Sequence, residues 1–288
     1  MTSRKAQAPS GDESVVYVYG VTRAKRWRAS AALLAGIVAE APVRPLAQGN
    51  LMAFVSTVPK SQFGADEFRS ALSDAKWLKD RILAHQHVLA ELQSCFDVVP
   101  FRFGTIYLDT AQASHALTRH SAQLCRAFDR IRGADEWGLK LYCDAPALRR
   151  RIECKSAAIR LLRAALAHAA PGAGFFLQKK LASAFDGETA AAVAGCVQHT
   201  HRRLAVCARE FAEIDVQPPG AHGRAADMVT NAACLIAKAS VPQFRRTIAR
   251  LQKQYAARGF DYELTGPWPP YHFVSIRHEV ADAAQPDR

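Results

Sequence analysis

The 288-residue sequence lacks the short motifs that mark common active sites. It contains no GxSxG nucleophile elbow, no HExxH zinc motif, no GxxxxGK[ST] phosphate loop and no GxGxxG turn. These absences remove the best-known signatures of hydrolases, metalloproteases and nucleotide-binding enzymes. We therefore expect a protein that is not an enzyme, with no catalytic residue, no cofactor and no metal site.

The seven cysteines include no CxxC pair, and several lie in apolar patterns where cysteine acts as a small hydrophobic residue. A disulfide scaffold is not expected, and the cytoplasm is the predicted compartment. The longest apolar run, residues 31–39, is less than half of the roughly 20 residues that cross a bilayer. No transmembrane segment or secretory signal is expected; residues 1–13 are predicted to be a disordered arm and residues 281–288 a loose tail.

The composition is that of a globular protein with an excess of positive charge. Hydrophobic residues make up 49% and charged residues 22%, and the length favours two domains. The net charge of +12 is compatible with an acidic partner, a nucleic acid or an anionic surface.

Residues 14–132 read as an N-terminal α+β domain. Gly49 and Asn50 supply a tight turn between two strands, and Asp66 can cap the clearest helix. The predicted order is βαββαβ, a split-βαβ or ferredoxin-like arrangement, followed by one more helix. The strands are expected at residues 15–20, 43–47, 51–56 and 96–107, and the helices at 29–40, 66–92 and 109–131.

Residues 133–280 read as a second domain of the same class with an extra long helical hairpin. Trp137, Leu139, Leu141 and Cys143 alternate on one face of its first strand. A Ser240/Gln243 capping box is expected to open its last helix. Strands are expected at residues 136–143, 214–217, 228–237, 261–265 and 271–276, and helices at 147–168, 175–209 and 240–259, with a helix-breaking loop at 171–174.

The sequence contains two His-x-His pairs that are candidate metal ligands. His85 and His87 are two residues apart, which on a helix points their side chains about 200° apart. The pair cannot hold one ion from a single helix face, and His199 and His201 have the same spacing. His85 lies on the apolar stripe of its helix, so we expect it to face the core and His87 to face solvent.

Clusters of arginine at residues 149–151, 202–203 and 245–246 are candidates for phosphate contacts. They fall on predicted helices whose other faces are apolar, and no aromatic residues are interleaved for base stacking. A solvated helix face is the favoured interpretation.

Three residues are the candidates for partner binding: Arg102, Trp268 and Tyr271. Arg102 stands between two phenylalanines on a predicted strand, where it must find a carboxylate or reach solvent. Trp268 and Tyr271 lie in an aromatic-proline run that forms either a rigid connection packed on the core or a docking surface.

Four motifs, in this order, resemble those of the gas vesicle protein GvpL/GvpF family. They are VYVYGV at residues 16–21, PFRFGT at 100–105, EWGLK at 136–140 and LTGPWPPY at 264–271. The resemblance covers about residues 14–278. It departs at Phe101, where methionine is expected, and at Ala173, where proline is expected.

This resemblance implies a non-enzymatic accessory or minor structural protein with two α+β domains, the second a modified ferredoxin-like fold. Such a protein is expected to bind the small hydrophobic shell protein of gas vesicles, to meet other gas vesicle accessory proteins, and to assist assembly or nucleation in the cytoplasm. No membrane partner is expected.

Two other classes of function stay open. A basic RNA- or DNA-binding module on ferredoxin-like domains would account for the charge of +12, although the aromatic signature of an RNA-recognition motif is missing. A small-molecule enzyme is also compatible with such a fold, because fold does not determine function.

Overall fold

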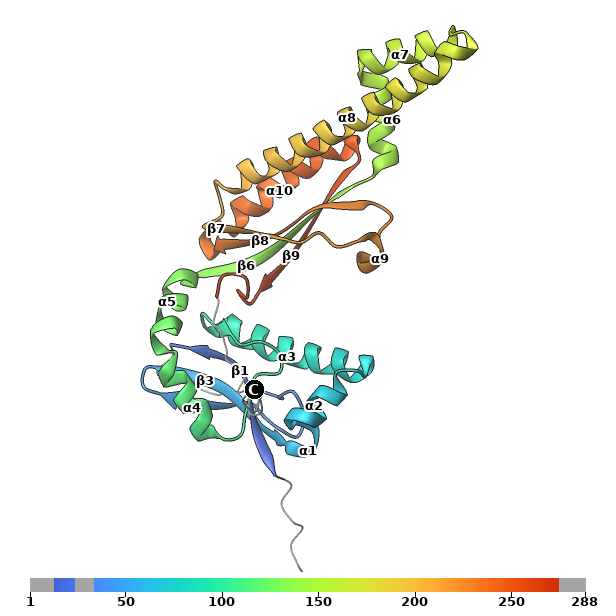
Figure 1. The fold of residues 1–288 in the computed structure, drawn as a ribbon. Helices are drawn as coiled ribbons and strands as arrows, with labels where there is room; N and C mark the ends of the chain where they lie inside the picture. The colour runs from blue at the N-terminus through green and yellow to red at the C-terminus, as the bar shows by residue number, and fades with distance from the viewer. Residues whose placement is uncertain (1–12, 24–33, 275–288) are drawn as a thin grey trace, which may run out of the picture. The chain divides into compact units, whose positions relative to one another are not determined.

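The computed structural model describes residues 13–23 and 34–274, which form two compact units (Figure 1). Unit 1 contains the described residues up to Arg132 together with residues 269–274, and unit 2 contains Gly133–Trp268. The arm expected at residues 1–13, apart from Glu13, and the tail expected at 281–288 lie outside the described residues.

Unit 1 is built on an antiparallel sheet whose central strand is almost completely buried. The strand order is β2-β3-β1-β4, and β5 also pairs with β1. The expected hairpin is present, with Gly49 at φ +60° in its turn. The strands are β1 (Ser14–Thr22), β2 (Arg44–Gln48), β3 (Leu51–Pro59), β4 (Val99–Pro100) and β5 (Ile106–Tyr107).

The helices of unit 1 are shorter than the apolar periodicity predicts. Asp74 accepts hydrogen bonds from the backbone N–H groups of Lys76 and Trp77, which starts a new helix inside the single helix expected at 66–92. The helix expected at 109–131 is divided at His120. The helices are α1 (Lys60–Phe63), α2 (Ala65–Ala71), α3 (Ala75–Cys95), α4 (Thr110–Arg119) and α5 (Ser121–Ile131).

The helix expected at residues 29–40 is wrong over its described part, residues 34–40, which form an irregular segment with a bend and a turn. The N–H of Ile37 donates to the hydroxyl of Tyr19 at 2.7 Å, and Val43 N–H donates to the carbonyl of Leu34. A Cβ on Gly36 would lie 2.0 Å from the carbonyl oxygen of Ala41. Contacts with the sheet therefore override the high helix propensity of the alanines.

A buried hydrogen-bond chain runs through the core of unit 1. Gly104 N–H donates to the Tyr17 hydroxyl, which lies 2.9 Å from His85 Nδ1. With Nδ1 accepting from Tyr17, His85 Nε2–H donates to the Tyr271 hydroxyl at 3.1 Å. Burial lowers the pKa of His85 to about 4, so the ring is neutral at neutral pH. His85 faces the core and His87 is exposed, as predicted.

Unit 2 repeats the strand order of unit 1 in an antiparallel sheet, β7-β8-β6-β9. Trp137, Leu139, Leu141 and Cys143 on β6 all join its core, as their alternation predicts. The strands are β6 (Ala134–Cys143), β7 (Glu210–Ile214), β8 (Asp227–Ala237) and β9 (Phe260–Trp268). The helices are α6 (Ala145–Lys155), α7 (Ala157–Ala167), α8 (Pro171–Leu204), α9 (Pro219–His222) and α10 (Val241–Tyr255).

Several helix and strand boundaries in unit 2 differ from the expected ones. Ser156 accepts from the N–H of Ile159 and separates α6 from α7 within the helix expected at 147–168. Residues 171–174 are the first turn of α8, with Pro171 in the first helical turn, where no N–H is needed. Ser240 makes no side-chain cap bond, so the expected capping box is absent. The strand expected at 214–217 lies at Glu210–Ile214.

The aromatic-proline run leaves unit 2 after Trp268. Residues 269–273 form turns in which Tyr271 N–H donates to Pro269 and Phe273 N–H donates to Pro270, so the described part of the strand expected at 271–276 is not a strand. Tyr271 packs on the core of unit 1, which places residues 269–274 there and not in the expected domain 133–280.

We predict that Gly259→Ala destabilises unit 2. Gly259 has φ +86°, and an added Cβ would lie 2.9 Å from the carbonyl oxygen of Asp144. The strain and the clash together are expected to cost about 2–3 kcal/mol, measured by chemical denaturation. Gly223→Ala is the matched control, because Gly223 has φ +67° with open space around it. Equal losses in the two variants would contradict the role of the close approach.

We also predict that His85 makes stability depend on pH. Its pKa of about 4 lies below the ordinary value of 6.5, so the unfolded chain takes up the proton first as pH falls. The contribution of neutral His85 to the free energy of unfolding is fully present above about pH 6.5 and falls by about 3 kcal/mol towards pH 4. Denaturation across this range should show a shallower pH dependence for His85→Gln than for wild type, with His87→Gln as control. Parallel curves for wild type and His85→Gln would refute this assignment.

Candidate functional site

The predicted contact residues lie in different surroundings. Arg102 is exposed in the turn between β4 and β5, where its carbonyl accepts from both the N–H and the hydroxyl of Thr105. Trp268 ends β9 with 45% of its surface exposed, and its Nε1–H donates to the Thr265 hydroxyl at 3.0 Å. These two side chains are available to a partner, but they belong to different units.

Tyr271 packs against the hydrophobic core of unit 1. Its side chain is half-buried, its hydroxyl meets His85, and its ring packs on the hydrophobic cluster around Tyr17. The structure thus separates the two aromatic residues of the aromatic-proline run: Trp268 reaches solvent, and Tyr271 connects a terminal segment to a central helix.

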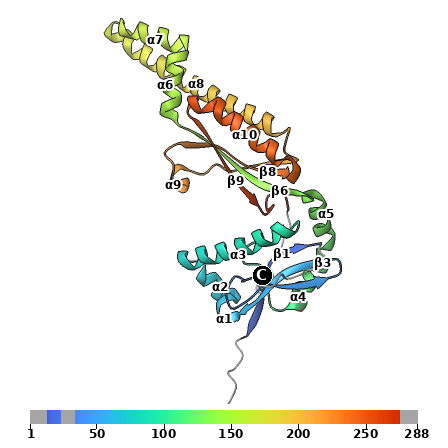
Figure 2. The same cartoon turned by 180° about the vertical axis from the view of Figure 1, so that it is seen from behind.

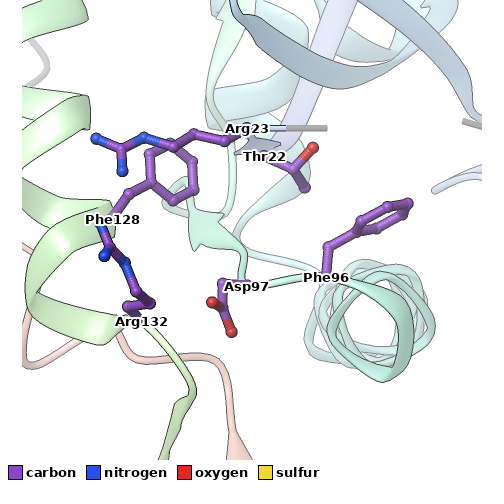
Figure 3. A pocket seen from close by; sticks show the side chains of 6 residues that line it. All are labelled: Thr22, Arg23, Phe96, Asp97, Phe128 and Arg132. Carbon is purple, nitrogen blue, oxygen red and sulfur yellow. The ribbon is translucent and has the colours of Figure 1, made fainter. Parts of the chain in front are cut away.

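A small cavity of about 170 Å³ in unit 1 combines charged and aromatic side chains (Figure 3). Arg23 and Arg132 both bind Asp129, at 2.8 and 2.6 Å, and Arg23 lies 5.3 Å from the centre of the Phe128 ring. The hydrogen bond from Arg23 lowers the pKa of the Asp129 carboxyl. Both guanidinium groups are therefore already paired with a carboxylate of the same unit. The lining residues are Thr22, Arg23, Phe96, Asp97, Phe128 and Arg132.

Burial keeps the thiols of Cys143 and Cys234 unreactive. All seven cysteines are free, and burial raises the pKa of Cys143 to about 11 and that of Cys234 to about 12. A thiol with such a pKa stays protonated and unreactive at neutral pH. Across residues 13–23 and 34–274 no group of three or more His, Cys, Asp or Glu is arranged to hold a metal ion. None of the helices in these ranges is long and apolar enough to cross a bilayer.

The largest exposed apolar side chains lie on the hairpin formed by α7 and the first half of α8. Phe175 is 68% exposed, Phe176 73% and Leu161 71%, and the two phenylalanine rings contact each other edge to face. In Figures 1 and 2 this hairpin extends beyond the sheet of unit 2. We call Leu161, Phe175 and Phe176 the hairpin tip.

The stretch of chain that carries the hairpin tip is rich in basic residues. Residues 157–184 contain four Lys or Arg and no Asp or Glu. One of these, Arg163, pairs with Glu153 on α6. Contiguous exposed apolar side chains of this kind are typical of interaction surfaces.

Sequence reasoning did not select the hairpin tip as a site. Residues 175–177 were predicted only as the start of the long helix expected at 175–209. A signal was present: Phe175 and Phe176 are adjacent, and neighbouring side chains on a helix point about 100° apart. Adjacent positions are both buried where the packed face of a helix is wide, as at Val88 and Leu89 of α3, so a narrow two-helix hairpin favours exposure of at least one ring.

Comparisons with known proteins find relatives that match most of this chain. The profile of the family "Gas vesicle synthesis protein GvpL/GvpF" matches residues 15–275. Gas vesicle protein L of Streptomyces sp. (strain CB03234) is 30% identical over 279 residues, covering 93% of this chain and 96% of the relative. Gas vesicle protein F of the same strain is 29% identical over 266 residues, covering 90% and 98%.

Two solved structures share the fold. The crystal structure of the gas vesicle protein GvpF from Anabaena sp. PCC7120 superposes with a TM-score of 0.71 at 18% identity, covering 92% of this chain and 100% of that one. GvpF from Microcystis aeruginosa gives a TM-score of 0.63 at 18% identity, covering 91% and 99%. The fold and the near-complete family match together mean that this chain belongs to the GvpL/GvpF family of gas vesicle proteins.

Proposed function

We propose that this protein is a cytoplasmic gas vesicle accessory protein that binds the small hydrophobic shell protein and assists vesicle assembly or nucleation. Membership of the family supports a role in gas vesicles. The observation that carries the finer proposal is the hairpin tip, where three large apolar side chains are held in solvent by a two-helix support.

The hairpin tip suits a hydrophobic subunit for a physical reason. Burying one phenylalanine side chain against a partner contributes about 1.5–3 kcal/mol, so two adjacent rings can supply much of a micromolar affinity. The basic residues of the same stretch, one of which is paired with Glu153, favour solubility of the free protein, because they repel a second copy of the same surface. Such a surface can hold an apolar subunit without self-association.

Arg102 and Trp268 are proposed as secondary contacts with gas vesicle partners, including other accessory proteins. Both side chains are exposed, and a partly exposed tryptophan or arginine is typical of interface hot spots. Tyr271, the third candidate from the sequence, is proposed to act through the fold, because its hydroxyl meets His85 in the core.

The first test is capture of the purified principal shell protein by this chain at low and high salt, with an unrelated basic protein as control. Selective capture that persists at high salt is expected, because apolar contacts are not screened by ions. In the double variant Phe175→Ser/Phe176→Ser, capture should fall about tenfold or more while the melting temperature stays unchanged.

Leu108→Ser is the matched control for this double variant, because Leu108 is 62% exposed and belongs to unit 1, whereas α7 and α8 belong to unit 2. It should capture the shell protein normally. If capture disappears at high salt and the unrelated basic protein captures equally well, net charge alone explains the binding and the proposal is contradicted. The nucleic-acid alternative would then be tested in its place.

Trp268→Ala distinguishes an interface residue from a core residue. With 45% of the side chain exposed, we expect a small change in melting temperature and a loss of vesicle assembly in cells that carry the variant. Global unfolding of the purified variant would instead show that Trp268 is needed for the fold. Phe244→Ala, at a fully buried position of unit 2, provides the reference for unfolding.

A further inference from the structure

A second cavity, of about 300 Å³, opens in unit 2 at the opposite end of α8 from the hairpin tip. It lies where the last turn of α8 meets α10, two helices that run side by side in both views (Figures 1 and 2). Gln243, Arg246, Thr247 and Arg250 recur at helical spacing, so they line it from one face of α10. We call Arg203, Arg246 and Arg250 the arginine triad.

The arginine triad has no carboxylate partner. No ion pair joins any of its three members to an Asp or Glu in the described part of the chain, and all three are exposed. The two stretches that supply them, residues 189–209 and 241–260, hold eight Lys or Arg and no Asp or Glu. The cavity in unit 1 differs in this respect, since both of its arginines form an ion pair with Asp129.

The placement of these charges is unfavourable for the isolated protein. Arg246 and Arg250 are four residues apart on α10, and like charges at that spacing destabilise a helix. Arg203 adds a third guanidinium from α8. A guanidinium group binds carboxylates and phosphates through paired hydrogen bonds, so an anion in the cavity would relieve the repulsion of all three.

We infer that this cavity binds the carboxylates of an acidic segment of a partner protein. Val206 lies on the rim with 76% of its surface exposed and offers an apolar contact beside the charges. The amide of Gln243 adds a neutral donor. The cavity has no aromatic lining residue on which a base could stack, which favours a peptide over single-stranded nucleic acid.

The test measures fluorescence anisotropy of a labelled helical peptide that carries four glutamates and one leucine, added to the full chain. We expect saturable binding, and no binding of the same peptide with glutamine in place of glutamate. The double variant Arg246→Gln/Arg250→Gln should bind the acidic peptide about tenfold or more weakly, since charge-assisted contacts are lost. Circular dichroism and melting temperature check that both variants fold.

Arg150→Gln/Arg151→Gln is the matched control, because it removes the same charge from an exposed face of α6. It should bind the acidic peptide within about twofold of wild type. An equal loss in the two double variants would overturn the proposal and assign the binding to net charge. Tighter binding of a labelled single-stranded oligonucleotide than of the peptide, weakened by the triad variant, would overturn it in favour of nucleic acid.

This inference goes beyond the proposed function and can fail separately from it. The peptide assay contains no shell protein, and the shell-protein assay examines the hairpin tip. Loss of shell capture in the phenylalanine variant with unchanged peptide binding would show that the two surfaces act independently.

Discussion

Hydrogen bonding on both edges of a central strand is the constraint on which each unit depends. β1 pairs with β3 on one side and with β4 and β5 on the other, and β6 pairs with β8 and β9. A strand with two neighbours has its backbone groups satisfied and can bury both faces. On β1, the buried hydroxyls of two tyrosines hydrogen-bond to segments distant in sequence. Tyr17 bonds to His85 and to the N–H of Gly104, and Tyr19 accepts from the N–H of Ile37.

Both proposed binding surfaces lie on helices of unit 2, and α8 contributes to each of them. α8 is 34 residues long but packs on the core of unit 2 only from about Leu181 onward, at positions such as Phe185, Cys196 and Leu204. Its first turns, with α7, form the exposed hairpin, and its last turn contributes to the arginine-lined cavity. The rise of an α-helix places these surfaces roughly 40 Å apart. One rigid element thus separates an apolar surface from a cationic one.

Elements marked by a regular apolar pattern were predicted correctly, whereas breaks within such a pattern were not. The alternation along β6 and the apolar stripe that contains His85 are local patterns, and both were read correctly. The helix breaks at Asp74, His120 and Ser156 were missed, because apolar spacing continues across each of them. Asp74 and Ser156 cap a new helix with their own side chains, which periodicity alone cannot distinguish from a solvent-facing position.

The sequence by itself determined the α+β class, the family resemblance and the long strands of both sheets, because β-branched runs, turn residues and ordered motifs are local features. Only the tertiary structure decided which candidates face solvent. Trp268 and Tyr271 are three residues apart, yet one is exposed and the other meets a histidine 186 positions away. It also decided that Arg203 joins Arg246 and Arg250. Exposure and convergence of charge depend on chain segments that meet only after folding, and no local pattern encodes them.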